Sequence, residues 1–122
     1  MENINQDIEV LKLRLRDFSS SRDWDQFHSL RNLIFALVGE VGELAAEVQW
    51  VSDTDVESYL ADPTKKSAIA SEMADILNYL VRLADKLNID LVEEALKKID
   101  LNEDRYPAEK ARGSSAKYTV YE

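Results

Sequence analysis

Two segments of this chain carry the same acidic motif inside a long helical pattern. Glu40 and Glu43 lie three residues apart within residues 33–50, and Glu72 and Asp75 repeat that spacing within residues 71–87. Helical residues turn by about 100° each, so positions three apart project from the same side of a helix. Each pair forms one carboxylate face beside an apolar stripe. The sequence therefore predicts two helices that pack along their stripes and bring four carboxylates into one small volume.

Such a cluster of carboxylates needs a positive charge nearby. Unit charges a few ångströms apart repel by about 1–4 kcal/mol at surface dielectrics. Hard divalent cations such as Mg²⁺ accept all-oxygen ligands and would neutralise the cluster. The alternative is that both pairs belong to solvated helix faces. Against it stand Gly39 and Gly42, because a glycine inside a helix costs about 0.5–1 kcal/mol relative to alanine, and keeping two predicts the close approach of a helix or ligand.

Composition narrows the class of protein. A chain of 122 residues that is 45% hydrophobic and 32% charged suits one domain of helices. The absence of cysteine excludes disulfides, thiolate zinc sites and cysteine nucleophiles. A net charge of −9 disfavours a nucleic-acid polymer as partner. No apolar run reaches the ~20 residues of a membrane span, and residues 1–7 lack the features of a signal peptide, so we expect a cytoplasmic protein with no membrane partner.

Periodicity and capping signals predict four long helices and therefore an all-α fold. The first begins at Ile4 and ends near the serines at 19–21, where short polar side chains weaken the helix. The second begins after Ser29 as N-cap and reaches Trp50, with its apolar residues 33–38 buried. The third runs over residues 66–87, after a linker with one helical turn at 56–60. The fourth follows Asp90 as N-cap and ends before Pro107.

Residues 22–28, RDWDQFH, are rich in groups that bind ligands. Aromatic rings with amide and imidazole partners suit a nucleobase pocket, through stacking and edge hydrogen bonds. The alternative is a hydrophobic plug at a helix start. His28 is the only histidine in the chain, and a lone histidine cannot form a zinc triad. A di-iron bundle is disfavoured because neither acidic pair is followed by histidine, and a purely structural coiled-coil partner leaves the glycines and the repeated acids unexplained.

Four stretches together resemble the all-α nucleotide pyrophosphohydrolases of the MazG-like superfamily, and most closely their dCTP pyrophosphatase branch. They are RDWDQFH (22–28), LVGEVGELAAEVQW (37–50), SEMADILNYLVRLA (71–84) and RYPAEKARGSSAKYT (105–119). The resemblance implies one MazG-like four-helix domain over residues 1–122 that assembles as a homo-oligomer, either a dimer or a dimer of dimers. It also implies Mg²⁺-dependent cleavage of a nucleoside triphosphate between the α and β phosphates.

The resemblance assigns roles to particular residues. The implied metal ligands are Glu40, Glu43, Glu72 and Asp75, with Mg²⁺, or possible Mn²⁺, as the ion. The implied substrate-binding residues are Trp24, Asp25, Gln26, Phe27, His28, Trp50 and Tyr79. As this sequence aligns with the family, Leu15 stands where well-known members carry a substrate-contacting histidine, so the resemblance does not define the base preference.

The chemistry of the residues agrees with this expectation. An acidic protein admits a triphosphate beside divalent cations, which also activate water. We expect Glu43 to act as general base. The tail, residues 108–122, either folds over phosphates or forms a flexible terminus, and the candidate phosphate-binding residues are Arg105, Lys110, Arg112 and Lys117. The expected activity is hydrolysis of dCTP, or a related or modified pyrimidine deoxynucleotide, for nucleotide-pool clearance. The alternative is a helical module that binds nucleotides without turnover.

Overall fold

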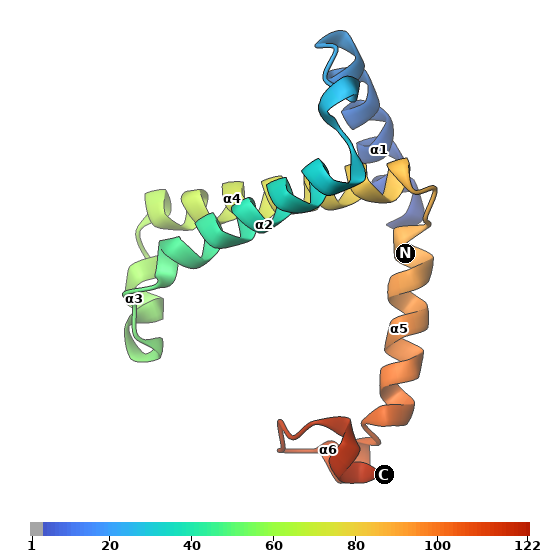
Figure 1. The fold of residues 1–122 in the computed structure, drawn as a ribbon. Coiled ribbons are helices and arrows are strands. Elements are labelled where there is room, and N and C mark those ends of the chain that lie inside the picture. The colour runs from blue at the N-terminus through green and yellow to red at the C-terminus, as the bar shows by residue number, and fades with distance from the viewer. Residues whose placement is uncertain (1–3) are drawn as a thin grey trace. The chain divides into compact units, whose positions relative to one another are not determined.

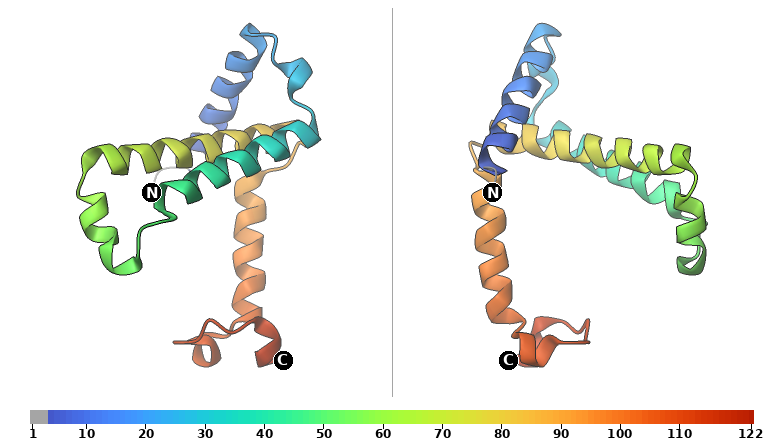
Figure 2. Two further views of the ribbon diagram at one scale, coloured as in Figure 1. Left: turned by 60° about the vertical axis from the view of Figure 1, so that its left-hand side comes forward. Right: turned by 180° about the vertical axis from the view of Figure 1, so that it is seen from behind.

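Two long helices, α2 (Leu30–Val48) and α4 (Pro63–Lys86), form the centre of the fold. In the computed structural model, which describes residues 4–122, they lie side by side in every view (Figures 1 and 2). Leu33 of α2 and Val81 of α4 are each only 1% exposed and form the core between them. Residues 4–122 contain helices and turns and no β-strand, so the predicted all-α class is confirmed.

Helix α1 (Ile4–Ser21) packs against α4. It presents Leu11 and Leu15 half-buried, while Ser19 near its end is buried. The chain then turns at Asp23, whose backbone has a positive φ of 54°, and enters the short 3-10 helix η1 (Asp25–Phe27). The Gln26 amide donates to the Asp23 carbonyl and carboxylate at 3.1 and 2.8 Å and so stabilises this turn. As predicted, residues 22–28 interrupt the long helices.

A second short connection joins α2 to α4. It contains the 3-10 helix η2 (Asp53–Asp55) and one short helix, α3 (Val56–Leu60), which confirms the helical turn predicted at residues 56–60. The Tyr59 hydroxyl donates to the Glu47 carbonyl at 2.6 Å. This bond ties α3 to the carboxyl end of α2, where helix carbonyls lack partners within the helix.

Helix caps explain where the elements begin. The Ser29 hydroxyl accepts from the Asn32 amide at 3.1 Å, and the Asp90 carboxylate accepts from the Glu93 amide at 3.0 Å, which confirms both predicted N-caps. Helix α4 begins at Pro63, three residues before the predicted start, because Asp62 caps it by accepting from the Thr64 amide at 2.9 Å. Proline is well suited to the first helical turn, where its missing N–H costs nothing.

One prediction about α2 is wrong. The helix ends at Val48, close to the predicted end at about Trp50, but residues 33–38 are not buried as a group. Leu33 is buried, but Phe35 is 58% and Val38 61% exposed. A Cβ added at Gly39 or Gly42 would meet no atom within 4 Å in the described part of this chain, so no helix of this chain approaches these glycines closely.

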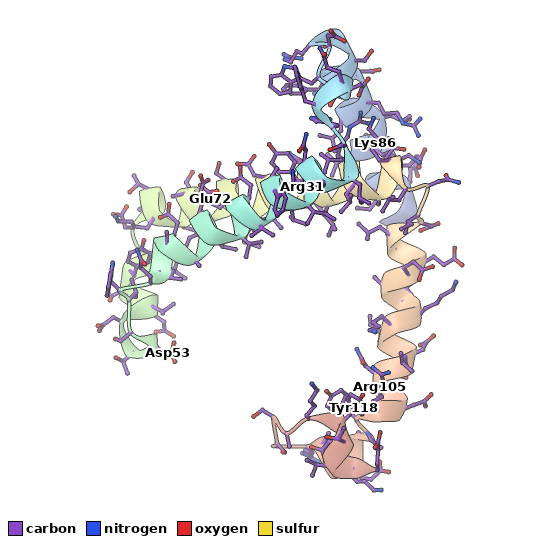
Figure 3. The ribbon with its side chains drawn as sticks, in the orientation of Figure 1. Arg31, Asp53, Glu72, Lys86, Arg105 and Tyr118 are labelled. Atoms are coloured by element: carbon purple, nitrogen blue, oxygen red, sulfur yellow. The ribbon has the colours of Figure 1, made fainter. Side chains whose placement is uncertain are left out.

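The chain divides into two units, with residues up to Asn88 in the first and Ile89–Glu122 in the second. The second unit contains α5 (Leu91–Arg105), α6 (Ala108–Ala111) and the 3-10 helix η3 (Tyr118–Tyr121). Its tail folds back on α5: the Tyr106 ring packs edge-on against Tyr118 and Tyr121, and the Arg105 guanidinium lies 4.6 Å from the Tyr118 ring (Figure 3). None of the helices in residues 4–122 combines the length and apolar character that a membrane crossing requires.

Candidate active site

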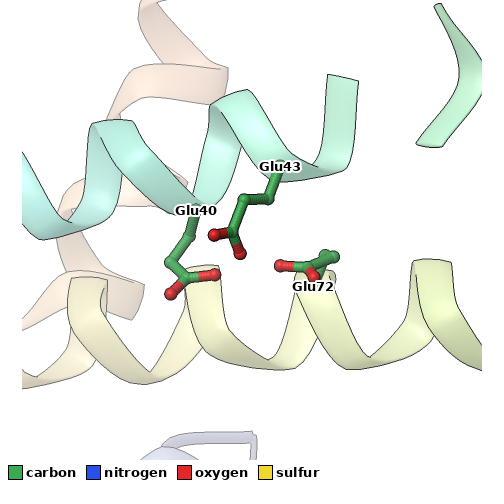
Figure 4. Close-up of side chains that lie close together, drawn as sticks. All are labelled: Glu40, Glu43 and Glu72. Carbon is green, nitrogen blue, oxygen red and sulfur yellow. The ribbon is translucent and has the colours of Figure 1, made fainter. Parts of the chain in front are cut away.

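Three of the four predicted carboxylates meet in the space between α2 and α4. Glu40 and Glu43 reach across from α2, and Glu72 points toward them from α4 (Figure 4). One carboxylate oxygen of each lies within 4.8 Å of the others. Because α2 and α4 pack along their length, the three-residue spacing that places Glu40 and Glu43 on one face delivers both to the partner helix.

Crowding of these acids changes their protonation. The pKa of Glu40 is raised to about 7, first because burial removes hydration from the charged form, and then because of its hydrogen bonds and repulsion with neighbouring acids. For Glu72 the hydrogen bond with Glu40 lowers the pKa, but loss of hydration and the charges of Glu43 and Asp75 outweigh it, so the net shift is upward. The negative charge of these carboxylates is therefore not fully stabilised by the residues of the site themselves.

The donor set fits a hard divalent cation. The Oε2 atoms of Glu40 and Glu72 are buried, and neither has a hydrogen-bond partner among residues 4–122. A buried carboxylate oxygen without a partner is costly. A cation bound by Glu40, Glu43 and Glu72 would satisfy these oxygens, and all-carboxylate oxygen ligands are those that Mg²⁺ and similar ions prefer.

Asp75, the fourth predicted ligand, is not part of the three-carboxylate cluster. It lies close enough to raise the pKa values of Glu40 and Glu72, and it lines a neighbouring cavity of about 310 Å³. That volume is at the lower end of the range for small-molecule sites. The cavity joins the acidic cluster to aromatic and polar groups, and its walls include Glu40, Asp75, Asn78, Tyr79, Trp24 and His28.

The aromatic end of this cavity comes from α1 and the turn after it. Phe18 packs edge-on against Trp24 with ring centroids 5.5 Å apart, and both rings line the cavity. Leu15 also lines the cavity, at the position where the sequence departs from the family pattern. The apolar side chain of Leu15 shapes this part of the cavity wall but can form no hydrogen bond.

Arg82 also lines the cavity and was not among the predicted site residues. Its side chain is 8% exposed and pairs with Asp25 and Asp85. Its Nε donates to His28 Nδ1 at 3.2 Å. The sequence does carry a signal for it: Glu72, Asp75, Tyr79 and Arg82 are spaced by three, four and three residues, which places them along one edge of α4.

Other predicted site residues lie elsewhere. Gln26 is engaged with Asp23 in its own turn, Phe27 is 58% exposed and Trp50 is 90% exposed, and none of the three lines the cavity. Asp25 reaches it indirectly, through Arg82. The candidate phosphate-binding residues Arg105, Lys110, Arg112 and Lys117 all belong to the second unit, and their role stays a prediction.

A helical fold with a carboxylate cluster beside an aromatic cavity agrees with the outcome of family comparison. The model of the MazG-like family matches residues 38–120, and this chain belongs to that family. The resemblance seen in the sequence is thus confirmed.

Matches to individual proteins are more specific than the match to the family. The chain is 48% identical over 112 residues to dCTP pyrophosphatase 1 of Mus musculus, and equally so to that of Homo sapiens. These alignments cover 92% of this chain and 66% of each relative. Among solved structures, a pyrophosphatase from Archaeoglobus fulgidus DSM 4304 matches with a TM-score of 0.76 and 33% identity, covering 88% of this chain and 98% of the other.

Proposed function

We propose that this protein is a Mg²⁺-dependent nucleoside triphosphate pyrophosphohydrolase whose substrate is dCTP or a related or modified pyrimidine deoxynucleotide. The products are the nucleoside monophosphate and pyrophosphate, and the role is clearance of the nucleotide pool. The observation that carries the proposal is that Glu40 and Asp75 line the same cavity as Trp24 and His28. One continuous site then offers carboxylates for a metal–triphosphate and an aromatic wall for a base. The names of the relatives support the substrate.

The acidic residues of the site have different roles in the proposed reaction. Glu40, Glu43 and Glu72, with Asp75 beside them, would hold the cation, which would supply positive charge to neutralise phosphate oxygens and to acidify a water molecule. Glu43, the exposed member of the cluster, would act as general base and accept the proton of the attacking water. The water oxygen bonds to the α-phosphorus, and the bond from that phosphorus to the α–β bridging oxygen breaks, so pyrophosphate leaves with the bonding electron pair.

The base and sugar occupy the aromatic part of the cavity. Trp24 offers a ring face for stacking and is itself held by Phe18. Tyr79 lies one helical turn beyond Asp75 on α4, so it bridges the acidic and the aromatic ends. Because one cavity holds both the nucleoside and the triphosphate, the α-phosphorus is oriented relative to Glu43 before reaction.

We also propose that the chain self-associates through α2. Phe35, Val38, Gly39 and Gly42 follow a three-and-four spacing on one exposed helix face, with Phe35 58% and Val38 61% exposed. Apolar side chains beside two glycines suit the close packing of another helix. Multi-angle light scattering tests this proposal by measuring the mass of the protein in solution. We expect the mass of a dimer or tetramer, and we expect the Val38→Asp variant to form a smaller assembly. A monomer at all micromolar concentrations would refute it.

The activity is tested with a nucleotide panel. Purified protein is incubated with each common NTP and dNTP, with Mg²⁺, with Mn²⁺ and with EDTA, and the products are separated. We expect dCMP and pyrophosphate from dCTP, dependent on the metal. Release of inorganic phosphate alone would contradict the proposed bond, and tight dCTP binding without product would favour the non-catalytic binding module.

Two variants test the residue roles. Glu43→Gln and Asp75→Asn keep size and shape but remove a charge, and each should lower kcat at least about 100-fold, the scale of a lost general base or metal ligand. Glu57→Gln, an exposed glutamate of α3, is the matched control and should retain full activity. Circular dichroism must show unchanged helix content in all three. Full activity of either test variant would remove it from the site.

A further inference from the structure

The buried guanidinium of Arg82 has each of its donor nitrogens engaged. Nη2 pairs with the Asp25 carboxylate, Nη1 donates to Asp85 at 3.4 Å, and Nε donates to His28 Nδ1 at 3.2 Å. These partners come from the turn after α1, from α4 itself and from the entry to α2. The guanidinium therefore has one orientation, set from three sides.

The Asp85 carboxylate is fixed in turn by α1. The guanidinium of Arg16 donates to both of its oxygens, at 2.7 and 2.6 Å, in a two-pronged ion pair. The Asp85 side chain is 8% exposed, as is that of Arg82, so water competes little for either. The chain Arg16–Asp85–Arg82–His28 thus transmits the position of α1 to the imidazole ring.

The hydrogen bond from the arginine fixes the tautomer of the histidine. A guanidinium has five N–H donors and no acceptor, so the ring nitrogen that faces it must be unprotonated. In a neutral imidazole the proton then resides on the other nitrogen, Nε2. Burial and the charge of Arg82 both lower the pKa of His28, which keeps the ring neutral near pH 7. His28 also lines the cavity.

We propose that Arg82 is a positioning residue, which holds His28 in the Nε2–H tautomer so that the imidazole donates a hydrogen bond to the substrate base. The inference rests on the proposed function for its ligand. A fixed donor suits the N3 atom of cytosine, which accepts a hydrogen bond, whereas N3 of uracil and thymine carries a hydrogen. The pair therefore favours dCTP over dUTP, whereas the side chain of Leu15, which lines the same cavity, contributes no polar group.

The tautomer is measured directly by NMR. Because the sequence contains one histidine, long-range ¹⁵N–¹H spectra of the full-length, ¹⁵N-labelled protein without an affinity tag report His28 alone. We expect the Nε2–H pattern at pH 7.5 in the free protein. An Nδ1–H ring, or a fast mixture of both tautomers, would overturn the positioning role. This measurement needs neither substrate nor variant.

Base selectivity is the second readout. Arg82→Lys keeps the positive charge but not the three nitrogens that bond in three directions, and Arg82→Met removes the donor to His28. Each should lower the ratio of kcat/KM for dCTP over dUTP by about tenfold, the scale of one hydrogen bond, as should His28→Ala. Arg14→Gln is the matched control: Arg14 is an exposed arginine of α1 outside the Arg16–Asp85–Arg82–His28 chain, so the ratio for this variant should match that of the parent protein.

The outcomes separate a positioning role from a structural one. If the Arg82 variants unfold at lower temperature but keep the parent ratio of dCTP to dUTP, Arg82 is only structural and the proposal fails. If Arg82→Met does not fold, Arg82→Lys decides. Absence of hydrolysis with every nucleotide would refute the proposed function, while the NMR measurement would still decide the role of Arg82.

Discussion

Replacing Asp85 with asparagine removes the carboxylate that joins Arg16 to Arg82. Arg16 loses a two-pronged ion pair at 2.7 and 2.6 Å, but its side chain is 50% exposed and returns to water, so this part costs only about 1 kcal/mol. Arg82 is 8% exposed and keeps Asp25, so its partial loss costs about 1–2 kcal/mol. We therefore expect Asp85→Asn to lower the free energy of unfolding by about 2–3 kcal/mol at pH 7.

The pH dependence of this loss carries a definite sign. The hydrogen bonds from Arg16 and the charge of its guanidinium hold the pKa of Asp85 below its ordinary value, although burial of the carboxylate opposes this shift. Its contribution is then fully present above the unfolded pKa of about 3.9 and disappears as the pH falls through the lower folded pKa. The difference in stability between the parent protein and Asp85→Asn should be constant from pH 6 to pH 8 and shrink below about pH 4.

Urea denaturation followed by circular dichroism measures both quantities. All samples are kept at one protein concentration, because self-association would otherwise shift the midpoint. Asp100→Asn, an exposed aspartate of α5, serves as the control and should change stability by less than about 0.5 kcal/mol. A loss below about 0.5 kcal/mol for Asp85→Asn, or an equal loss at pH 3 and pH 7, would refute the reasoning.

Three further predictions concern the core, a cap and the acidic cluster. Leu33→Ala opens a cavity beside a side chain that is 1% exposed and should cost about 2–5 kcal/mol in urea denaturation. Ser29→Ala removes the acceptor for the Asn32 amide and should cost about 1 kcal/mol while dCTP turnover persists. Because the pKa of Glu40 is raised to about 7, the metal-free protein should lose thermal stability as the pH rises from 5 to 8, and Mg²⁺ should restore it at pH 8; a scanning-calorimetry profile that rises with pH would contradict this.

Local signals explain what the sequence predicted well. The N-caps at Ser29 and Asp90 depend on side chains that bond to amides three residues away, and the spacing of Glu40 and Glu43 depends on helix geometry alone. Such features are complete within one turn of helix, so no knowledge of the tertiary fold is needed.

Features that depend on distant partners were missed. The burial of Arg82 requires Asp25, which lies 57 residues away, and a buried charge is recognisable only once its counter-charge is placed. Likewise, Phe35 and Val38 look like core residues by hydropathy, but their exposure depends on how many helices surround α2. The start of α4, by contrast, has a local signal, because Asp62 followed by Pro63 is typical of an N-cap and a first helical residue.

The division of the cavity between segments has a consequence for how this family diversifies. Acids on α2 and α4 occupy one end, while Leu15, Phe18 and Trp24 from α1 and its following turn line the other. A substitution in α1 would then change the apolar end of the cavity without touching the acids on α2 and α4. Chimeras that exchange α1 between homologues offer a direct route to altered substrate choice.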